Sequence, residues 1–482
     1  MMKPNRQAFQ RESALAVNNT AQRLNLTRAM HTIRQRRQTR FDELQDSAAL
    51  RGLGGALKQE CLSRLPELLV ELESNLTRNG VRVHWAETAA EANAQILEIA
   101  RRNKVRLVVK GKSMVSEEIG LNDYLSKNGI QAVEADLGEF IVQLAGQTPS
   151  HIVVPAVHMD RTEIARRFHE ALGTEYSEDP TTLTWMARKV LREHFQQAGM
   201  GVTGVNFAVA ETGTLALVEN EGNGRMVTTV PPVHVALMGL EKVVARLDQV
   251  PPLLRLLTRS ATGQAITSYN NWILGPRKER EKDGPHEVHL IILDNGRSAI
   301  YADAQLRETL DCIRCGACLN ICPVYERVGG HAYGSVYMGP IGKILTPQMA
   351  GLKSAGHLAQ ASTLCGACYQ VCPVKIPIPE LLLRLRQEAV EPTPTGRVMV
   401  AQAGRGRRAL EALVWKGWSL AASRPALYRA TLFPLKMMGG LFGGLIGGFL
   451  AGLTPPGRAW ARTRTLPVPR RASLNRLLQD RN

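Results

Sequence analysis

The cysteines of this chain of 482 residues are the side chains whose spacing points most directly to chemistry. Seven of the eight form two runs, Cys312-x2-Cys315-x2-Cys318-x3-Cys322-Pro323 and Cys365-x2-Cys368-x3-Cys372-Pro373. The first run has the spacing of iron–sulfur proteins, in which short gaps let one loop supply three ligands to a cubane cluster. The second repeats the last three cysteines, and Ser362 stands where its first cysteine would be. The repeat predicts two iron–sulfur clusters, and we expect both to be of the 4Fe–4S type.

The order of the two runs predicts which cysteines share a cluster. In two-cluster ferredoxins the cysteine before the proline ligates the other cluster, because the chain folds back on itself. We therefore expect the first cluster to bind Cys312, Cys315, Cys318 and Cys372, and the second to bind Cys322, Cys365 and Cys368. The fourth ligand of the second cluster stays open between Ser362, another residue, water and a partner protein, unless that cluster holds three irons.

Structural zinc is the alternative for these cysteines. Zinc prefers paired C-x2-C knuckles with four closed ligands at each site, and seven cysteines with two Cys-Pro ends fit that pattern badly. The 42 residues between Cys322 and Cys365 are too many for the compact hairpins of a small ferredoxin, so an α-helical ferredoxin-like module is expected. Cys61 stands apart in a helical stretch and is expected to be a small buried hydrophobe.

One arginine lies inside the first cysteine run. Arg314 would raise the reduction potential of its cluster by stabilising the added negative charge. The alternative is a solvated charge with no such effect.

The segment before the cysteines has the alternating pattern of an α/β layer. Apolar patterns predict strands at 81–85, 105–109 and 130–135 with helices between them, the first introduced by the capping pair Thr88 and Glu91. Strands that alternate with helices favour a parallel sheet. Further strands are predicted at 151–157, 205–212, 214–220, 233–238 and 287–293.

Composition divides the chain into four predicted parts. Residues 1–60 form a basic helical segment, 61–300 an α/β domain, and 301–390 the α-helical cysteine module. The proline-rich linker 391–396 then opens a basic C-terminal tail, 391–482, which includes a Gly-rich apolar stretch.

Polar side chains in the α/β part form a candidate anion or substrate site. A predicted strand ends at Lys110 and a helix follows, so Lys110, Lys112, Ser113 and the helix N–H groups could meet a carboxylate. A solvated turn is the alternative. Glu211 lies in a turn between two predicted strands, where either a functional glutamate or an ordinary hairpin residue would fit.

Two histidines bracket an apolar segment in the same part of the chain. His151 and His158 are expected to have structural roles, with the lining of a pocket as the alternative.

The net charge of +17 is concentrated at the two ends of the chain. Residues 1–60 hold 11 basic and 5 acidic residues, and residues 397–482 hold 15 basic and 2 acidic ones. Contacts with anionic membranes or acidic partners are therefore expected at the ends. An iron–sulfur regulator that binds nucleic acid is the alternative function, but the sequence lacks a convincing recognition helix or aromatic RNA platform. The start shows no secretory signal, which predicts a cytoplasmic protein.

The tail contains a stretch that resembles a short membrane segment. Residues 437–453 carry no charge, but seven are Gly, whereas a spanning helix needs about 20 strongly apolar residues. Trp415, Trp418 and Trp460 suit an interface, so we expect peripheral contact at the inner face of the membrane or docking on partner subunits. A true membrane span and a flexible segment are the alternatives. Residues 404–409 have dinucleotide-fingerprint spacing without the required strand and acidic residue, so no NAD or flavin motif is expected.

Motifs along nearly the whole chain resemble the lactate utilization protein B family. They include VVKGKSMVSEEIGLN at 108–122, GVTGVNFAVAETGTLALVENEGN at 201–223, DNGRS at 294–298, CIRCGACLNICPVY at 312–325 and LCGACYQVCPVKI at 364–376. The stretch 430–460 resembles the family least.

This resemblance implies an LUD domain with a NagB/RpiA/CoA-transferase-like fold, then a ferredoxin-like two-cluster domain and a basic helical tail. It implies an electron-transfer subunit of a flavin-independent oxidoreductase complex, an L-lactate dehydrogenase that forms pyruvate. The implied partners are a LutA-like cysteine-rich subunit and a LutC-like second LUD protein. No side chain here is a clear catalytic base for lactate, so a partner subunit is an alternative location for that chemistry.

Overall fold

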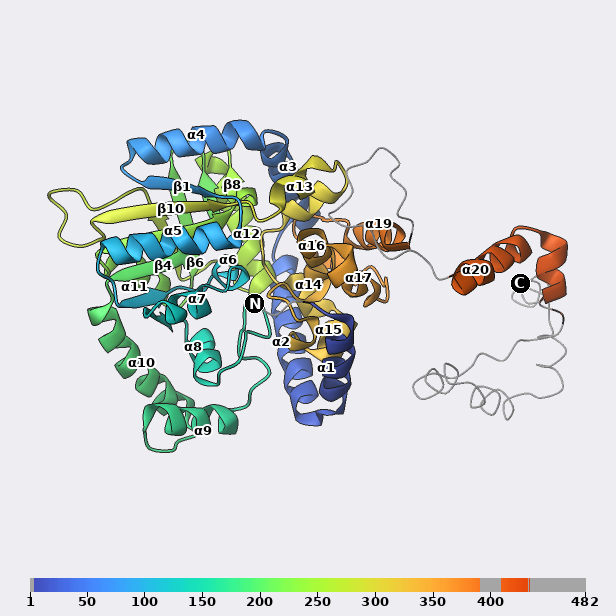
Figure 1. Cartoon of the computed structure of the whole chain (residues 1–482), viewed down its shortest axis with the longest axis horizontal. Helices are drawn as coiled ribbons and strands as arrows, with labels where there is room; N and C mark the ends of the chain where they lie inside the picture. The colour runs from blue at the N-terminus through green and yellow to red at the C-terminus, as the bar shows by residue number, and fades with distance from the viewer. Residues whose placement is uncertain (1–3, 391–408, 432, 434–482) are drawn as a thin grey trace. The chain divides into compact units, whose positions relative to one another are not determined.

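A six-stranded sheet lies at the centre of the α/β part in the computed structural model, which describes residues 4–390, 409–431 and 433 (Figure 1). In spatial order its strands are β1 (Arg82–Ala86), β10 (Glu287–Leu293), β7 (Val233–Gly239), β4 (Met200–Gly204), β2 (Leu107–Lys110) and β3 (Gln131–Glu134). All neighbouring strands are parallel. The prediction of a parallel α/β sheet is confirmed.

Helices cover both faces of this sheet. Alternate side chains such as Val108 and Ile291 pack on one face, and Val109 and Val133 pack on the other. Because both faces are buried, the strands are almost continuously apolar. The helices of this part are α5 (Ala89–Arg102), α6 (Met114–Glu118), α7 (Leu121–Lys127), α8 (Leu137–Leu144), α9 (Arg161–Leu172), α10 (Pro180–Gln197) and α11 (Asn223–Thr229).

Strand β4 was not among the predicted strands. Its sequence Met200-Gly-Val-Thr-Gly204 includes two glycines, which weaken the apolar pattern of a strand. The structure shows why one of them is needed. A Cβ on Gly201 would lie 2.1 Å from the carbonyl oxygen of Val227 in α11, so only glycine lets the helix approach the strand this closely.

A second sheet of four strands follows the order β8-β5-β6-β9. Its strands are β5 (Phe207–Val209), β6 (Thr214–Glu219), β8 (Val243–Val244) and β9 (Tyr269–Ile273). Strands β5 and β6 lie within the strands predicted at 205–212 and 214–220, and they pair antiparallel. The helices α3 (Ser47–Ser63), α4 (Leu65–Arg78) and α12 (Val250–Ala261) and the 3-10 turns η1 (Leu240–Lys242) and η2 (Leu247–Gln249) pack around it.

The predicted strand at 151–157 is wrong, because this segment consists of bends and turns. The imidazole Nδ1 of His151 accepts the backbone N–H groups of Val153 at 3.0 Å and Val154 at 3.1 Å. A side chain that bonds the following backbone donors stabilises a turn in competition with a sheet ladder. The apolar run therefore packs as a loop, with Ile152 in the core.

The cysteine-containing region is helical, as expected. Residues 301–390, all of them described, contain no strand. Its helices are α13 (Arg297–Ala302), α14 (Ala317–Ile321), α15 (Pro323–Val328), α16 (Gly339–Ala350), α17 (Leu352–Gln360), α18 (Ala367–Val371) and α19 (Ile378–Val390), with the 3-10 turns η3 (Leu306–Asp311) and η4 (His331–Tyr333).

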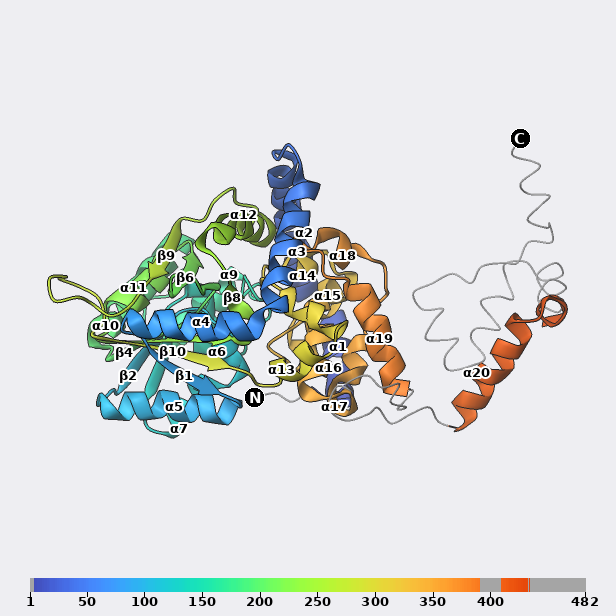
Figure 2. The same ribbon diagram turned by 90° about the horizontal axis from the view of Figure 1, so that it is seen from above.

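The N-terminal helices α1 (Arg6–Asn18) and α2 (Thr20–Asp42) lie beside this region (Figures 1 and 2). Both contact α15, and α2 also contacts α14. Arg34 pairs with Glu326 at 2.9 Å. The N-terminal segment therefore packs against the first cysteine run, although the two are far apart in the sequence.

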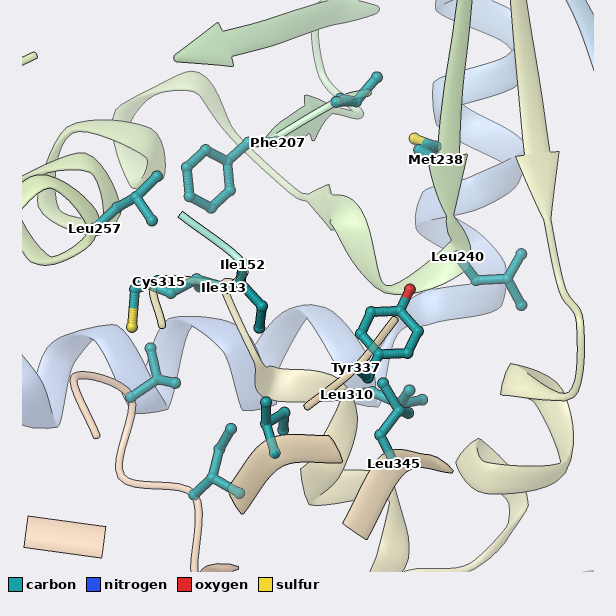
Figure 3. Packing of buried hydrophobic residues seen from close by; sticks show 14 of the residues in the cluster. Ile152, Phe207, Met238, Leu240, Leu257, Leu310, Ile313, Cys315, Tyr337 and Leu345 are labelled. Carbon is teal, nitrogen blue, oxygen red and sulfur yellow. The ribbon is translucent and has the colours of Figure 1, made fainter. Parts of the chain in front are cut away.

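One hydrophobic core joins the α/β part to the helical region. Met238 and Leu240, at the end of β7, belong to the same buried cluster as Leu310, Tyr337 and Leu345 (Figure 3). The end of β7 is therefore buried against the helical region that contains the cysteines.

Contacts divide the chain into two units, Met1–Arg405 and Gly406–Asn482. In the second unit, helix α20 (Ala409–Ala422) has only exposed or half-buried side chains. None of the helices within the described residues is long and apolar enough to cross a membrane. The Gly-rich stretch 437–453 lies outside the described residues.

Candidate iron–sulfur centre

Four cysteines line one pocket in the helical region. Cys312, Cys315 and Cys318 come from the first run, and Cys372 comes from the second. Apolar side chains surround them, including Ile152 from the α/β part. This is the set that the sequence predicted for the first cluster.

The remaining cysteines line a second pocket. Cys322 from the first run meets Cys365 and Cys368 from the second, and Ser362 lines the same pocket. Cys365 is exposed, whereas Cys315 and Cys372 are buried. The second pocket is therefore the more accessible to solvent.

The donor chemistry of the two pockets suits iron–sulfur clusters, which thiolates hold. Within the described part of the chain, no group of three or more His, Cys, Asp or Glu side chains could hold a metal ion. The cysteines of each pocket instead surround a common space, which a cluster of several irons would fill with one thiolate at each corner.

Burial and neighbouring cysteines raise the pKa of Cys315, Cys318, Cys368 and Cys372, which favours their protonated form before a metal binds. Burial, with neighbouring thiolates, raises the pKa of Cys315 to about 12 and the pKa of Cys368 and of Cys372 to about 11. Ligands must lose their protons to bind metal, so loading of the pockets would release protons.

Hydrogen bonds reach several of the sulfur atoms. The N–H of Ile376 donates to Cys372 Sγ at 3.3 Å, and the N–H of Tyr325 donates to Cys322 Sγ at 3.5 Å. The ammonium of the buried Lys343 also lies 3.5 Å from Cys322 Sγ. Hydrogen bonds and positive charge near sulfur favour the reduced state of a cluster.

Arg314 is buried beside the first pocket and is not a solvated charge. Its Nη2 atom donates to Glu241 Oε1 at 3.0 Å, and its guanidinium lies 4.8 Å from the centre of the Tyr337 ring. Burial alone would lower the pKa of Arg314, but the neighbouring Cys312, Tyr337 and Glu241 raise it above the ordinary value. A permanent positive charge therefore lies next to Cys312.

The sequence did not reveal the buried charged network to which Arg314 belongs. Arg297 Nε donates to Glu241 Oε2 at 2.7 Å, and its Nη2 donates to Glu118 Oε2 at 2.7 Å. The hydroxyl of Tyr337 also donates to Glu118. Burial would raise the pKa of Glu241, but Arg297 and Arg314 lower it to about 2, so its carboxylate is ionised.

Topology explains how this network forms. Glu241 follows β7, Arg297 follows β10 and Glu118 follows β2 through helix α6. The carboxyl ends of parallel strands meet at one edge of the sheet, where α/β proteins commonly bind ligands. Here the charged side chains connect that edge to the loop of the first cysteine run. The sequence feature that could have indicated this network was a charged residue after each of the three strands.

The predicted anion-site residues are already paired within the chain. Lys110 is fully buried and donates to Glu134 Oε1 at 2.6 Å and to Glu117 Oε1 at 3.0 Å. Burial opposes its charge, but these carboxylates raise the pKa of Lys110 above its ordinary value. The solvated-turn alternative is therefore wrong for Lys110.

Lys112 and Ser113 lie close to that lysine. Lys112 Nζ donates to Asp136 Oδ2 at 3.1 Å and to the carbonyl of Val153 at 3.0 Å. Ser113 caps helix α6 by accepting the N–H of Ser116 at 3.2 Å. The anion site stays a prediction, and Lys112 is its most accessible cation, with 30% of its side chain exposed.

Glu211 lies elsewhere, in the turn between β5 and β6. Its Oε2 accepts the N–H of Leu247 at 3.1 Å, and no hydrogen bond or ion pair in the described residues joins it to Lys110, Lys112 or Ser113.

Both histidines have structural roles in the described chain. His151 Nδ1 accepts backbone donors, so its proton lies on Nε2, which donates to Asn320 Oδ1 at 2.8 Å. His158 bonds Ser150 Oγ at 2.7 Å and Gln147 Oε1 at 2.6 Å. Because Asn320 lies inside the first cysteine run, His151 also ties the α/β part to that loop.

Three protein families match successive parts of the chain. The LUD domain matches residues 69–293, the 4Fe-4S dicluster domain matches 308–376, and the C-terminal domain of lactate utilisation protein B matches 384–482. The fold and the cysteine pockets therefore belong to an iron–sulfur protein with an LUD domain. The stretch 430–460, which resembles the family least, lies within the match of the C-terminal domain at 384–482.

Relatives match most of the length of the chain. The chain is 47% identical over 388 residues to lactate utilization protein B of Bacillus cereus (strain AH820), covering 80% of this chain and 79% of that protein. It is 43% identical over 429 residues to lactate utilization protein B of Bacillus pumilus (strain SAFR-032), covering 89% and 88%. The chain belongs to the lactate utilization protein B family.

The chain is also similar to a second named protein and to a solved structure. The uncharacterized electron transport protein YkgF of Escherichia coli (strain K12) is 47% identical over 363 residues, covering 75% of this chain and 76% of that protein. A solved DUF162 family structure from Deinococcus radiodurans covers 48% of this chain and 98% of its own, with 14% identity and a TM-score of 0.27, which is too low to carry a fold argument.

Proposed function

We propose that this chain is the iron–sulfur electron-transfer subunit of a complex that oxidises L-lactate to pyruvate. The observation that carries the proposal is the pair of cysteine pockets, each lined by cysteines from both runs. The names of the relatives, lactate utilization protein B and an electron transport protein, support lactate as the substrate and electron transfer as the role. In this proposal residues 61–300 form the LUD domain with a NagB/RpiA/CoA-transferase-like fold, and residues 301–390 bind the clusters.

Oxidation of lactate to pyruvate releases two electrons and two protons. Two bound clusters would accept the electrons one at a time and pass them to an acceptor. The chain's own residues would set the driving force: Arg314 places a positive charge beside the first pocket, and Lys343 places one at Cys322 of the second.

The proposal includes two partner subunits, one LutA-like and cysteine-rich and one LutC-like with a second LUD domain. Binding of lactate would fall to this chain's LUD domain or to a partner. Within this chain, Lys112 is the cation best placed for a carboxylate, because it is half-buried and lies after β2 at the carboxyl edge of the sheet.

We also propose a cytoplasmic protein whose tail contacts the inner face of the membrane. Support comes from the exposed apolar and basic side chains of the second unit. Trp415, Trp418 and Phe433 are exposed, and the two tryptophan rings pack edge to face. Aromatic rings with basic residues suit the boundary between lipid headgroups and acyl chains.

The direct test is to co-purify the chain with its partner subunits under anaerobic conditions and to add L-lactate. Cluster reduction should appear in the EPR spectrum with L-lactate, with D-lactate as the stereochemical control. Deletion of the gene should abolish growth on L-lactate in a strain without another lactate oxidase. Normal growth of that strain, or clusters that L-lactate never reduces in the intact complex, would overturn the proposal.

A further inference from the structure

The second pocket has three cysteines and one position where the repeat lacks a cysteine. Ser362 occupies that position in the sequence and lines the same pocket as Cys322, Cys365 and Cys368. The backbone of the two runs favours a ligand role for its hydroxyl over a place in the pocket wall.

Cys312 and Ser362 occupy equivalent positions in the two loops. In the first run, Arg314 has a left-handed φ of 60°, and its N–H donates to Cys312 Sγ at 3.4 Å. In the second run, Leu364 has a left-handed φ of 55°, and its N–H donates to Ser362 Oγ at 3.2 Å. Ser362 Oγ therefore takes the position relative to its loop that Cys312 Sγ takes in the first.

The loops also continue alike. Gly316 with φ 74° precedes helix α14, and Gly366 with φ 80° precedes helix α18. A left-handed φ at the non-glycine residues Arg314 and Leu364 costs about 1 kcal/mol or more each. Two unrelated side chains that adopt this conformation at the same motif position indicate a loop shaped to surround a ligand.

We propose that Ser362 Oγ is the fourth ligand of the second cluster, an inference that rests on the proposed cluster binding. On binding iron, the Ser362 hydroxyl would lose its proton to solvent water, which has access to this pocket through the exposed Cys365. The resulting alkoxide would carry the same charge as a thiolate, and the N–H of Leu364 would donate to its oxygen. One iron of this cluster would therefore have an oxygen ligand and three would have only sulfur.

The test compares the full chain with three variants after anaerobic reconstitution with iron and sulfide. The wild-type chain should bind about eight irons, one of them with a distinct Mössbauer signal. Ser362→Ala should lose about one iron and gain the EPR signal of an oxidised three-iron cluster. Ser362→Cys should keep about eight irons and lose the distinct signal. Ser354→Ala, which removes an exposed hydroxyl on α17, is the matched control and should behave as wild type.

The outcomes separate this inference from the proposed function. If Ser362→Ala keeps a four-iron second cluster with an unchanged Mössbauer spectrum, water or a partner holds the fourth iron and the inference is wrong. If Ser362→Ala does not fold, a Ser362→Cys spectrum identical to that of wild type would equally show that the inference is wrong. If the wild-type chain binds no cluster at all, cluster binding itself fails.

Discussion

At the scale of single residues, the proline-flanked cysteines are the positions where sequence order and spatial order differ. Cys372 lies in the second run but lines the pocket of the first, and Cys322 does the reverse. Each pocket thus depends on both runs. Cysteines divided in this way would stabilise the fold as well as a bound cluster, because loading would fix the two runs against each other.

Alanine variants of these cysteines should separate the two clusters. We expect Cys372→Ala to lose the first cluster and Cys322→Ala to lose the second, each with about half of the iron. Iron and sulfide analysis with EPR of the reduced protein would show which signal remains. Cys61→Ala is the matched control and should keep all the iron, because Cys61 is buried in α3 and lines neither pocket. Loss of the second signal in Cys372→Ala would contradict the crossed assignment.

The carboxylate of Glu241 sets the charge around Arg314. It is paired with both Arg297 and Arg314, and all three side chains are at least 93% buried. Removal of one partner from a buried ion network leaves an uncompensated charge, which costs several kcal/mol.

We therefore expect Glu241→Gln to destabilise the protein by about 3 kcal/mol and to raise the reduction potential of the first cluster. The potential rises because the positive charge of Arg314 is no longer balanced. Denaturant unfolding and an EPR-monitored redox titration would measure the two effects. Asp248→Asn, which removes one partner of an exposed ion pair with Arg246, is the control and should change neither. An unchanged potential in Glu241→Gln would show that Arg314 does not tune the cluster.

The sequence predicts the cysteine sets but not this network. Cluster ligands follow a local spacing that one loop must satisfy, so Cys312, Cys315 and Cys318 are visible in the sequence. Glu118, Glu241 and Arg297 meet only because three strands end at one edge, and strand order is not visible in a single sequence. Their signal was one charged residue after each strand.

At the scale of elements, the central strands bury a histidine that stays neutral. His234 of β7 bonds Thr203 Oγ1 of β4 at 2.8 Å and is fully buried. Burial, with the neighbouring His289, lowers the pKa of His234 to about 4. In the unfolded chain the same group titrates near 6.5.

Stability should therefore fall in acid as the pH drops from about 6.5 to about 4. In that window the unfolded chain binds a proton that folded His234 does not, so protons favour unfolding, by at most about 3 kcal/mol for this group. His234→Gln should reduce this loss of unfolding free energy between pH 7 and pH 4. His31→Gln on the exposed face of α2 is the control and should leave the loss unchanged. Equal pH profiles for wild type and His234→Gln would refute the assignment.

The strands also show where the prediction of elements fails. Strand β4 was missed because Gly201 and Gly204 weaken its apolar pattern, although Gly201 is needed by helix α11. Residues 151–157 were predicted as a strand because they are apolar, but His151 bonds the backbone donors that a strand would need. In both cases tertiary contacts decide the structure over the local pattern.

At the scale of the whole molecule, the two basic ends differ in the contacts of their described residues. Arg37 and Arg51 of the N-terminal segment donate to the carbonyls of Val371 and Cys372, in the second cysteine run. Part of the N-terminal positive charge is therefore bound to the second cysteine run of the same chain. The unit Gly406–Asn482 carries most of the remaining excess charge, and its described helix α20 is exposed.

This difference predicts a separable role for the tail. A chain that ends at Arg405 should keep its iron content and cluster spectra, because no cysteine lies beyond Cys372. It should lose binding to vesicles that contain anionic lipid, because about 1 kcal/mol of attraction per surface basic residue disappears with the tail. Co-sedimentation of the full chain should weaken at high salt and with neutral vesicles.

Trp415→Ala with Trp418→Ala in the full chain should weaken binding without a change in charge. If the chain that ends at Arg405 sediments with anionic vesicles as well as the full chain does, the tail is not the membrane contact, and docking on a partner subunit becomes its role.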